Sequence, residues 1–221
     1  MTHATDPRSA QLVGMASQLG LPLDEVPAAQ LLAYVDLLQR WNATYNLTAI
    51  RDPAQMLSQH VADCLAVILP LQRHLGGRAA CRLLDVGSGG GLPGVVIASL
   101  CPGVDVTCVD TVGKKAAFIQ QIAGSLRLRN LHSQHARVER LEAPPFDVIT
   151  SRAFASLADF VDLTRRHLSR DGVWLAMKGK DPSVERAGLP ADVEAFHVEQ
   201  LRVPGLDAER CLVWMRTRCS L

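Results

Sequence analysis

The first part of the chain has the periodicity of amphipathic helices. Across residues 10–42 apolar residues recur every three or four positions, which places them on one face of a helix. The Leu-Gly-Leu-Pro run at residues 19–22 predicts a break within this segment. Asp52 followed by Pro53 is typical of a capped helix start, and the pattern after it predicts another helix to about residue 69.

Beyond residue 75 short apolar strands alternate with helices. Such alternation is typical of a parallel sheet built from strand–helix–strand units. The expected strands are 82–86, 105–109, 132–136, 146–149, 172–177, 197–203 and 211–216, and the expected helices are 92–100, 113–126, 156–168 and 182–188. Only residues 204–210 separate the last two strands, too few for a crossover helix, so this pair is predicted to be antiparallel.

The fold class expected from these patterns is α/β. Its centre is a doubly wound, mostly parallel seven-stranded sheet in one continuous unit, residues 76–221. An N-terminal helical extension, residues 1–75, packs on that core.

Composition narrows the class of protein. Of 221 residues, 48% are apolar and 20% charged, which suffices for a buried core and a hydrated surface. Lys and Arg total 23 against 22 Asp and Glu, so any contact with nucleic acid has to come from a local patch. No stretch approaches the ~20 apolar residues needed to cross a bilayer, and the six cysteines contain no Cys-x-x-Cys pair. We therefore expect a cytoplasmic protein with no membrane, no disulfide partner and no metal site.

A glycine-rich turn follows the first predicted strand. The sequence there is Asp85-Val86-Gly87-Ser88-Gly89-Gly90-Gly91-Leu92-Pro93-Gly94, and we call residues 87–94 the glycine turn. Glycine admits positive φ and lets a ligand approach the backbone closely. The start of the next helix favours an anionic group. The turn therefore predicts a site for a small ligand that carries a carboxylate or a phosphate.

Two cofactors fit this turn. Residues 89–94 satisfy the G-x-G-x-x-G pattern of nicotinamide dinucleotide sites, but the turn has already begun at Gly87 and the pattern puts Pro93 inside the phosphate-binding segment. Asp85 suits the amino group of a methionine better than a pyrophosphate. Asp110, at the end of the second strand, can accept hydrogen bonds from the ribose hydroxyls of either cofactor, or it can cap the following helix. S-adenosylmethionine is favoured, with NAD as the alternative.

Several segments resemble one known family. They are residues 41–48 (Trp-Asn-Ala-Thr-Tyr-Asn-Leu-Thr), 51–53, His60 with Asp63, the glycine turn, 113–115, 137–139, 146–147, 151–157 (Ser-Arg-Ala-Phe-Ala-Ser-Leu) and 177–179. In these segments, which span about residues 31–214, the chain is similar to the bacterial 16S rRNA guanine-N7 methyltransferases of the RsmG (GidB) family. The segments 46–48 and 151–155 are the specific ones, because many methyltransferases share the glycine turn.

The resemblance implies a fold, a reaction and a partner. The fold is that of class I SAM-dependent methyltransferases, and the cofactor is S-adenosylmethionine, which leaves as S-adenosylhomocysteine, without a metal. The substrate is N7 of a guanine, guanine 527 in the usual numbering, in 16S rRNA of the 30S subunit or a precursor of it. We expect a monomer. A small-molecule methyltransferase would share the whole cofactor half, so it stays an alternative function.

The expected cofactor contacts lie at or just beyond the ends of predicted strands. By resemblance they are Gly87, Leu92, Val138, Glu139 and Arg152, to which the residues themselves add Asp85, Gly89 and Asp110. At its strand end Arg152 can reach the methionine carboxylate or the RNA. The alternative for Arg152 is a surface salt bridge.

The target pocket is expected on the helix before the sheet. His60 and Asp63 are three residues apart and share a helix face, so they either line this pocket or form a structural histidine–carboxylate pair. Asn46 can bind a base edge or hold its own loop. Guanine N7 carries a free lone pair and needs no general base, so we assign no certain catalytic residue beyond the positioning candidates His60, Asp63 and Arg152. Candidate contacts to RNA phosphates are Arg127, Arg129, Arg165, Arg166, Arg170, Arg202, Arg210, Arg216 and Arg218.

Overall fold

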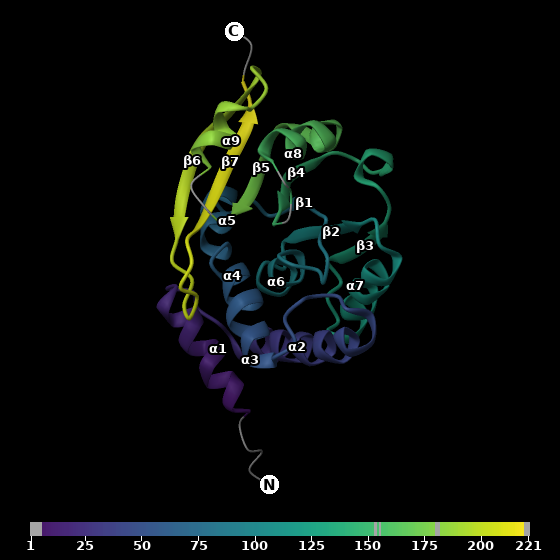
Figure 1. Ribbon diagram of the computed structural model, residues 1–221, viewed down its shortest axis with the longest axis vertical. Coiled ribbons are helices and arrows are strands. Elements are labelled where there is room, and N and C mark those ends of the chain that lie inside the picture. Colours follow the sequence, from purple (N-terminus) through teal and green to yellow (C-terminus); the bar gives the residue numbers. More distant parts are fainter. Residues whose placement is uncertain (1–5, 153, 155, 180–181, 219–221) are drawn as a thin grey trace.

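A computed structural model describes residues 6–152, 154, 156–179 and 182–218. Strands β1 to β7 form one sheet in the order β3-β2-β1-β4-β5-β7-β6 (Figure 1). Their bounds are β1 Cys81–Val86, β2 Val104–Asp110, β3 Leu131–His135, β4 Phe146–Ser151, β5 Leu168–Lys178, β6 Val193–Leu201 and β7 Arg210–Thr217. The first five strands pair in parallel, and β7 is antiparallel to both β5 and β6. The predicted mostly parallel sheet with an antiparallel last pair is confirmed.

Helices cover both faces of the sheet. Their bounds are α1 Pro7–Gln18, α2 Glu25–Tyr45, α3 Pro53–Met56, η1 Leu57–Val61, α4 Ala62–Leu65, α5 Ile68–Leu75, α6 Gly94–Leu100, α7 Gly113–Ser125, η2 Val138–Arg140, α8 Leu157–Thr164, η3 Arg165–His167 and α9 Ser183–Ala187. Successive residues of a strand face opposite sides, so Leu83 of β1 packs in the apolar cluster with α1 to α7, and Leu84 packs in the cluster with α8. This double coverage explains why β1 and β2 are buried along nearly their whole length.

The N-terminal helices follow the expected pattern. The predicted break lies between α1 and α2, and the Asp52 side chain accepts a hydrogen bond from the Ala54 amide at the start of α3. Leu31 of α2 and Leu65 of α4 belong to the same apolar cluster as Leu83 of the sheet. The N-terminal helices and the sheet therefore share one core. The division of the chain at residue 75 into a helical extension and a methyltransferase unit stays a prediction.

One helical run differs from the membrane expectation. Residues Pro53–Leu75 form a stretch of 23 residues with a mean hydropathy of 1.2, which is long and apolar enough to cross a bilayer by length and composition. Within it, 67% of the most apolar window is buried inside the protein, as in the core helix of a soluble protein. The expectation that no segment approaches membrane-spanning length is therefore wrong. Consecutive helical segments, α3 to α5, join several short apolar stretches into one long run.

Three element boundaries also differ from expectation. Helix α6 begins at Gly94 rather than at residue 92, and Pro93 is its N-cap residue. Strand β5 begins at Leu168 and displaces the end of the predicted helix 156–168. Strand β6 covers Val193–Leu201 instead of 197–203. As an edge strand, β6 is mostly half-exposed and has no clear apolar alternation to mark its start.

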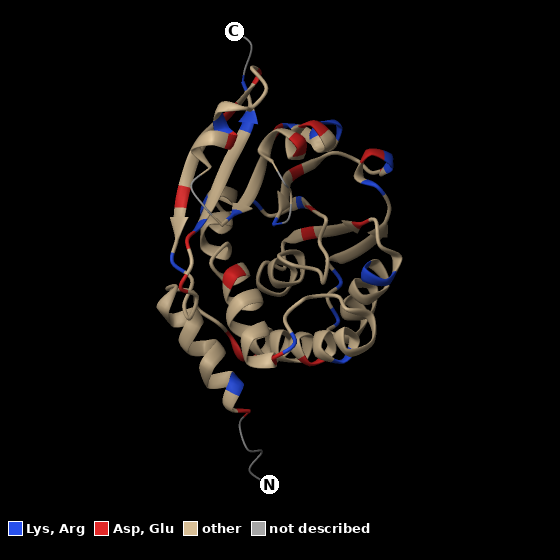
Figure 2. Ribbon diagram, viewed as in Figure 1, with Lys and Arg blue, Asp and Glu red and all other residues tan. Residues whose placement is uncertain are grey.

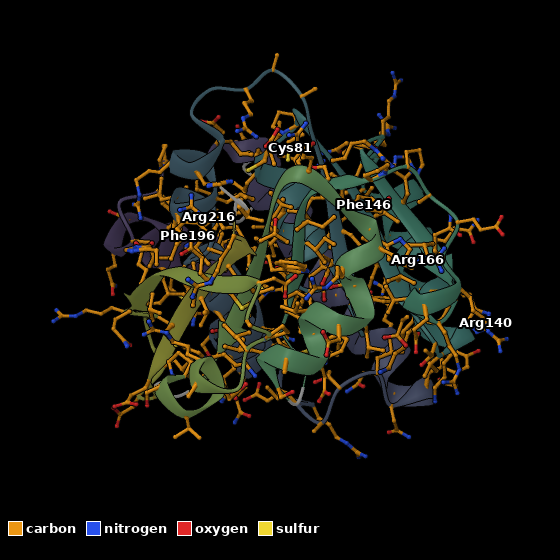
Figure 3. All side chains as sticks on the ribbon, turned by 90° about the horizontal axis from the view of Figure 1, so that it is seen from above. Cys81, Arg140, Phe146, Arg166, Phe196 and Arg216 are labelled. Atoms are coloured by element: carbon orange, nitrogen blue, oxygen red, sulfur yellow. The ribbon has the colours of Figure 1, made fainter. Side chains whose placement is uncertain are left out.

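The β6–β7 pair is held on its outer side by polar contacts. The guanidinium of Arg216 lies 4.8 Å from the ring centre of Phe196 (Figure 3), and its Nε donates to Glu194.

Positive and negative residues are interspersed along the ribbon (Figure 2), in agreement with the nearly balanced charge. Of the six cysteines that were predicted to be reduced, Cys64, Cys81, Cys101 and Cys108 are buried free thiols, Cys211 is buried, and Cys219 lies outside the described residues.

Candidate functional site

Two pockets flank the carboxyl end of β1. At this strand the chain order reverses, since β2 and β3 lie on one side of β1, and β4 and β5 lie on the other. Open α/β sheets bind ligands at this reversal point. The β2-side pocket, about 350 Å³, is lined by Gly87, Asp110 and Val138 among others. The β5-side pocket, about 330 Å³, is lined by His60, Asp63, Arg152, Lys178 and Arg210 among others.

The β2-side pocket contains four of the expected cofactor residues. Gly87 follows β1, Asp110 ends β2, and Val138 and Glu139 follow β3 in the short turn η2. Two side chains of η3 hold the backbone of η2 by hydrogen bonds. The Val138 carbonyl accepts a 2.7 Å hydrogen bond from the buried His167, and the Glu139 carbonyl accepts a 2.8 Å bond from Arg166. The pocket wall therefore has a fixed backbone.

Acidic side chains hold the glycine turn. Gly87, Gly89 and Gly91 have φ values of +66°, +57° and +89°, which other residues rarely adopt. Asp110 Oδ2 accepts from the Gly89 amide, and Asp85 Oδ2 accepts from the Gly94 amide, each at 2.9 Å. The turn is thereby fixed at both of its ends.

Asp110 lines the β2-side pocket and is fixed there by backbone amides. Its Oδ1 accepts a 2.9 Å bond from the amide of Val112, the residue directly before α7, and its Oδ2 accepts from the Gly89 amide. Val112 is itself the N-cap position of α7 and makes no side-chain cap bond, so Asp110 is not the cap of this helix.

Three expected cofactor residues are not among those that line either pocket: Gly89 and Leu92 in the glycine turn, and Asp85 in β1. The side chain of Leu92 is buried, and its amide donates to the Ser88 carbonyl at 3.0 Å. Asp85 is fully buried, and its Oδ1 has no hydrogen-bond partner in the described chain. An unpaired buried carboxylate oxygen is costly, and a ligand ammonium group would satisfy it. This orphaned oxygen fits the amino group of S-adenosylmethionine.

Burial also changes the acidity of Asp85. It raises the pKa of this carboxyl from 3.8 to about 7, against the opposing effects of the Gly94 amide and the charge of Arg152. Close to neutral pH the unliganded side chain is therefore a mixture of acid and carboxylate.

The raised pKa predicts a pH-dependent stability. Between about pH 4 and 7 the unfolded chain loses this proton while the folded chain keeps it, so the contribution of Asp85 to stability falls as the pH rises. The slope is at most about 1.4 kcal/mol per pH unit. Urea unfolding of wild type and Asp85→Asn at several pH values, without cofactor, measures it. The wild type should lose stability relative to the variant as the pH increases, and a constant difference would contradict the prediction.

The β5-side pocket is built around a buried ion cluster. Asp63 of α4 has a side chain only 4% exposed, with Oδ1 3.0 Å from Nε of Arg210 and Oδ2 3.6 Å from Nη1 of Arg152. Arg152 directly follows β4, and Arg210 begins β7. Burial raises the pKa of Asp63, and the two guanidinium groups act in the opposite direction. Arg152 is therefore an ion-pair partner inside a pocket, not in a surface salt bridge.

His60 and Asp63 line the same pocket, but each contacts other residues, so they do not form the structural histidine–carboxylate pair that was the alternative. Nε2 of His60 lies 2.7 Å from the hydroxyl of Thr48, while Asp63 faces the two arginines. Burial and the charge of Arg152 lower the pKa of His60 to about 4, so its ring is neutral at pH 7. Among the described residues, no three His, Cys, Asp or Glu side chains are grouped so that they could hold a metal ion.

The loop before the helical run is held by Asn42 rather than Asn46. The Asn42 side chain donates to the Ile50 carbonyl at 3.0 Å and accepts from the Thr48 amide at 2.8 Å. Asn46 is exposed and ends α2 in a left-handed conformation. The hypothesis that Asn46 holds the loop is thus wrong, because its neighbour one helical turn earlier makes the side-chain contacts.

Two site residues were not assigned to the site from the sequence. Arg210 was one of nine arginines considered for phosphate contacts, and it reaches Asp63 across 147 positions. Lys178 lies at the end of β5, where its ammonium pairs with Glu185 at 2.7 Å and donates to the Phe154 carbonyl at 3.2 Å. Its signal was the segment 177–179, which resembles the family but gave Lys178 no role.

Comparison with known proteins shows which family shares these features. A family model described as rRNA small subunit methyltransferase G matches residues 28–213. The Ribosomal RNA small subunit methyltransferase G of Paracidovorax citrulli (strain AAC00-1) is 61% identical over 228 residues, which covers 99% of this chain and 93% of that protein. The protein of the same name from Leptothrix cholodnii is 63% identical over 207 residues, 94% of each chain.

Solved structures share the fold at low sequence identity. TrmN from Thermus thermophilus has a TM-score of 0.55 and 18% identity over 73% of this chain and 53% of its own. A SAM dependent methyltransferase from Aquifex aeolicus has a TM-score of 0.53 and 13% identity over 74% of this chain and 93% of its own. The fold is that of class I SAM-dependent methyltransferases. Since the family model spans most of the chain and relatives of that name are about 60% identical over nearly all of it, this protein belongs to the rRNA small subunit methyltransferase G (GidB) family.

Proposed function

We propose that the protein transfers the methyl group of S-adenosylmethionine to N7 of a guanine in 16S rRNA of the small ribosomal subunit, at the position that corresponds to guanine 527. The observation that carries this proposal is the pair of pockets on opposite sides of the end of β1. One has apolar walls and the acidic residues Asp110 and Glu139, which suit an adenosine, and among the described residues of the other the cations Arg152, Lys178 and Arg210 outnumber the single carboxylate Asp63. The orphaned oxygen of Asp85 lies in the strand between them.

The residues divide between cofactor and substrate. Gly87, Asp110, Val138 and Glu139 would hold the adenosine part, with Asp110 as acceptor for ribose hydroxyls. Asp85 would receive the amino group. Arg152 would hold the methionine carboxylate, since it directly follows β4, the strand next to β1, and lines the β5-side pocket. Leu92 and Gly89 would contribute through the shape of the turn.

The β5-side pocket would receive the guanine. When bound, S-adenosylmethionine supplies an electrophilic methyl group on a positively charged sulfur. Methylation moves positive charge from the sulfur onto the purine, and Asp63, the one carboxylate among the described residues that line this pocket, is held in place by Arg152 and Arg210. The neutral His60 adds no opposing charge at pH 7. Because N7 loses no proton, the residues serve to orient the base and not to deprotonate it.

The partner follows from the reaction. We propose that the substrate is 16S rRNA within the 30S subunit or a precursor of it, and that the protein acts as a cytoplasmic monomer. Arg210 and Lys178 line this pocket and add positive charge that would favour binding of an RNA strand. No metal is proposed. NAD is no longer proposed as cofactor, since the chain belongs to a methyltransferase family.

The test is methyl transfer from tritiated S-adenosylmethionine to naked 16S rRNA, to 30S particles and to 70S ribosomes, followed by mapping of the labelled base. The expected result is label at N7 of one guanine, with one of the three particles preferred. A calorimetric titration with S-adenosylhomocysteine accompanies it. Labelling of a metabolite without RNA would favour the small-molecule alternative, and absence of S-adenosylhomocysteine binding at millimolar ligand would overturn the proposal.

A further inference from the structure

A tyrosine from the N-terminal helices contacts the glycine turn. Tyr34 lies in the middle of α2, and its side chain is completely buried. Its hydroxyl donates a 2.9 Å hydrogen bond to the carbonyl of Gly90, 56 positions later in the chain. Helix α2 therefore reaches the turn that connects β1 to α6 through a specific polar contact.

The contact is close as well as specific. A Cβ atom at Gly90 would lie 3.3 Å from Cδ1 of Leu38 and 3.4 Å from the hydroxyl of Tyr34, so the backbone of the turn rests directly on α2. The ring of Tyr34 also packs 6.2 Å from the ring of Phe118 on α7. Burial raises the pKa of the Tyr34 hydroxyl well above 10, so it stays a hydrogen-bond donor at neutral pH.

The middle of the turn is held from α2 as well as from within. Asp110 accepts from the Gly89 amide and Asp85 Oδ2 accepts from the Gly94 amide, so these two contacts bind amides and not the Gly90 carbonyl. Glycine on both sides leaves the Gly90–Gly91 peptide with little steric restraint, and its amide donates to the Ser88 carbonyl at 2.8 Å. The Tyr34 hydroxyl binds the carbonyl of the same peptide and so adds a second restraint on its orientation, from outside the sheet.

We propose that Tyr34 is a positioning residue for cofactor binding, because its hydroxyl holds the glycine turn in the conformation that S-adenosylmethionine requires. The inference rests on the proposed function, since it assumes that this turn binds that cofactor. It assigns the N-terminal helices a part in the cofactor site, in addition to packing on the sheet. Preorganised loops bind more tightly because less ordering entropy is lost on binding.

The test compares Tyr34→Phe with wild type. The phenylalanine keeps the ring and its packing and removes only the donor. The dissociation constant for S-adenosylhomocysteine and the KM for S-adenosylmethionine should each rise about three- to tenfold, as expected for one hydrogen bond. The kcat at saturating cofactor should change less than about twofold. Amide hydrogen exchange in residues 87–92 should become faster.

Ser133→Ala is the matched control. The Ser133 hydroxyl donates a 2.7 Å bond to the Ala116 carbonyl and links β3 to α7, away from the turn. This variant should lose a comparable amount of stability and leave cofactor affinity and turn exchange unchanged. Unchanged affinity together with unchanged exchange in Tyr34→Phe would overturn the inference. If the wild type failed to bind S-adenosylhomocysteine, the proposed function would fail, and exchange in the turn would still decide whether Tyr34 holds it.

Discussion

Replacement of Arg152 by alanine is expected to lower methyl transfer at least about 100-fold, as removal of one preorganised charged donor does in other active sites. The guanidinium lies next to Asp63, and its charge acts on Asp85 on the other side of the site. Removing it takes away the proposed partner of the methionine carboxylate and one of the two cations that face Asp63. Initial rates with tritiated S-adenosylmethionine and the preferred ribosomal substrate measure the loss.

Two further variants separate this effect from loss of folding. Arg73→Ala is the matched control, because Arg73 also forms an ion pair, with Glu199, but at an exposed position away from both pockets. Its activity should stay within about twofold of wild type. Arg152→Lys keeps the charge and loses the planar donor geometry, so it should recover part of the activity. A folded Arg152→Ala protein with wild-type turnover would remove Arg152 from the site.

The second large effect is expected from Gly94→Ala, at the start of α6. A Cβ atom there would overlap with Sγ of Cys108 and lie 2.9 Å from Oδ2 of Asp85, both of which are fully buried. Neither side chain can move easily, because Asp85 and Cys108 lie in the packed strands β1 and β2 beneath α6. We expect the free energy of unfolding to fall by about 2–3 kcal/mol and the melting temperature by roughly 5–10 °C. Affinity for S-adenosylhomocysteine should fall as well, since the Gly94 amide is the partner of Asp85.

Gly124→Ala provides the comparison. This glycine lies in α7, and an added Cβ meets no atom within 4 Å. Alanine in a helix should stabilise the protein by about 0.5–1 kcal/mol. Thermal unfolding followed by circular dichroism, with and without S-adenosylhomocysteine, distinguishes the two variants. Equal melting temperatures for both would show that the contact at Gly94 can relax, contrary to our expectation.

Most of the architecture was predictable because its signals are local. The alternation of buried strands and amphipathic helices gave all seven strands, and the short link of residues 204–210 gave the antiparallel pair. The glycine turn was recognisable because a run of glycines follows a predicted buried strand, and Gly87, Gly89 and Gly91 adopt positive φ there. Asp110 was a candidate because parallel strands present their carboxyl ends at one edge, whereas Arg152 was taken from the family resemblance.

Tertiary structure decided how these residues combine. No local pattern connects Tyr34 to Gly90 or Arg210 to Asp63, because these contacts join elements 56 and 147 positions apart. The unusual acidity of Asp85 likewise depends on complete burial, which α6 and the neighbouring strands produce only when they pack together. The linear order of residues therefore specifies strands, helices and the chemistry at their ends. The distances and burial that turn those groups into a site arise only from long-range packing, whose partners have no fixed spacing along the chain.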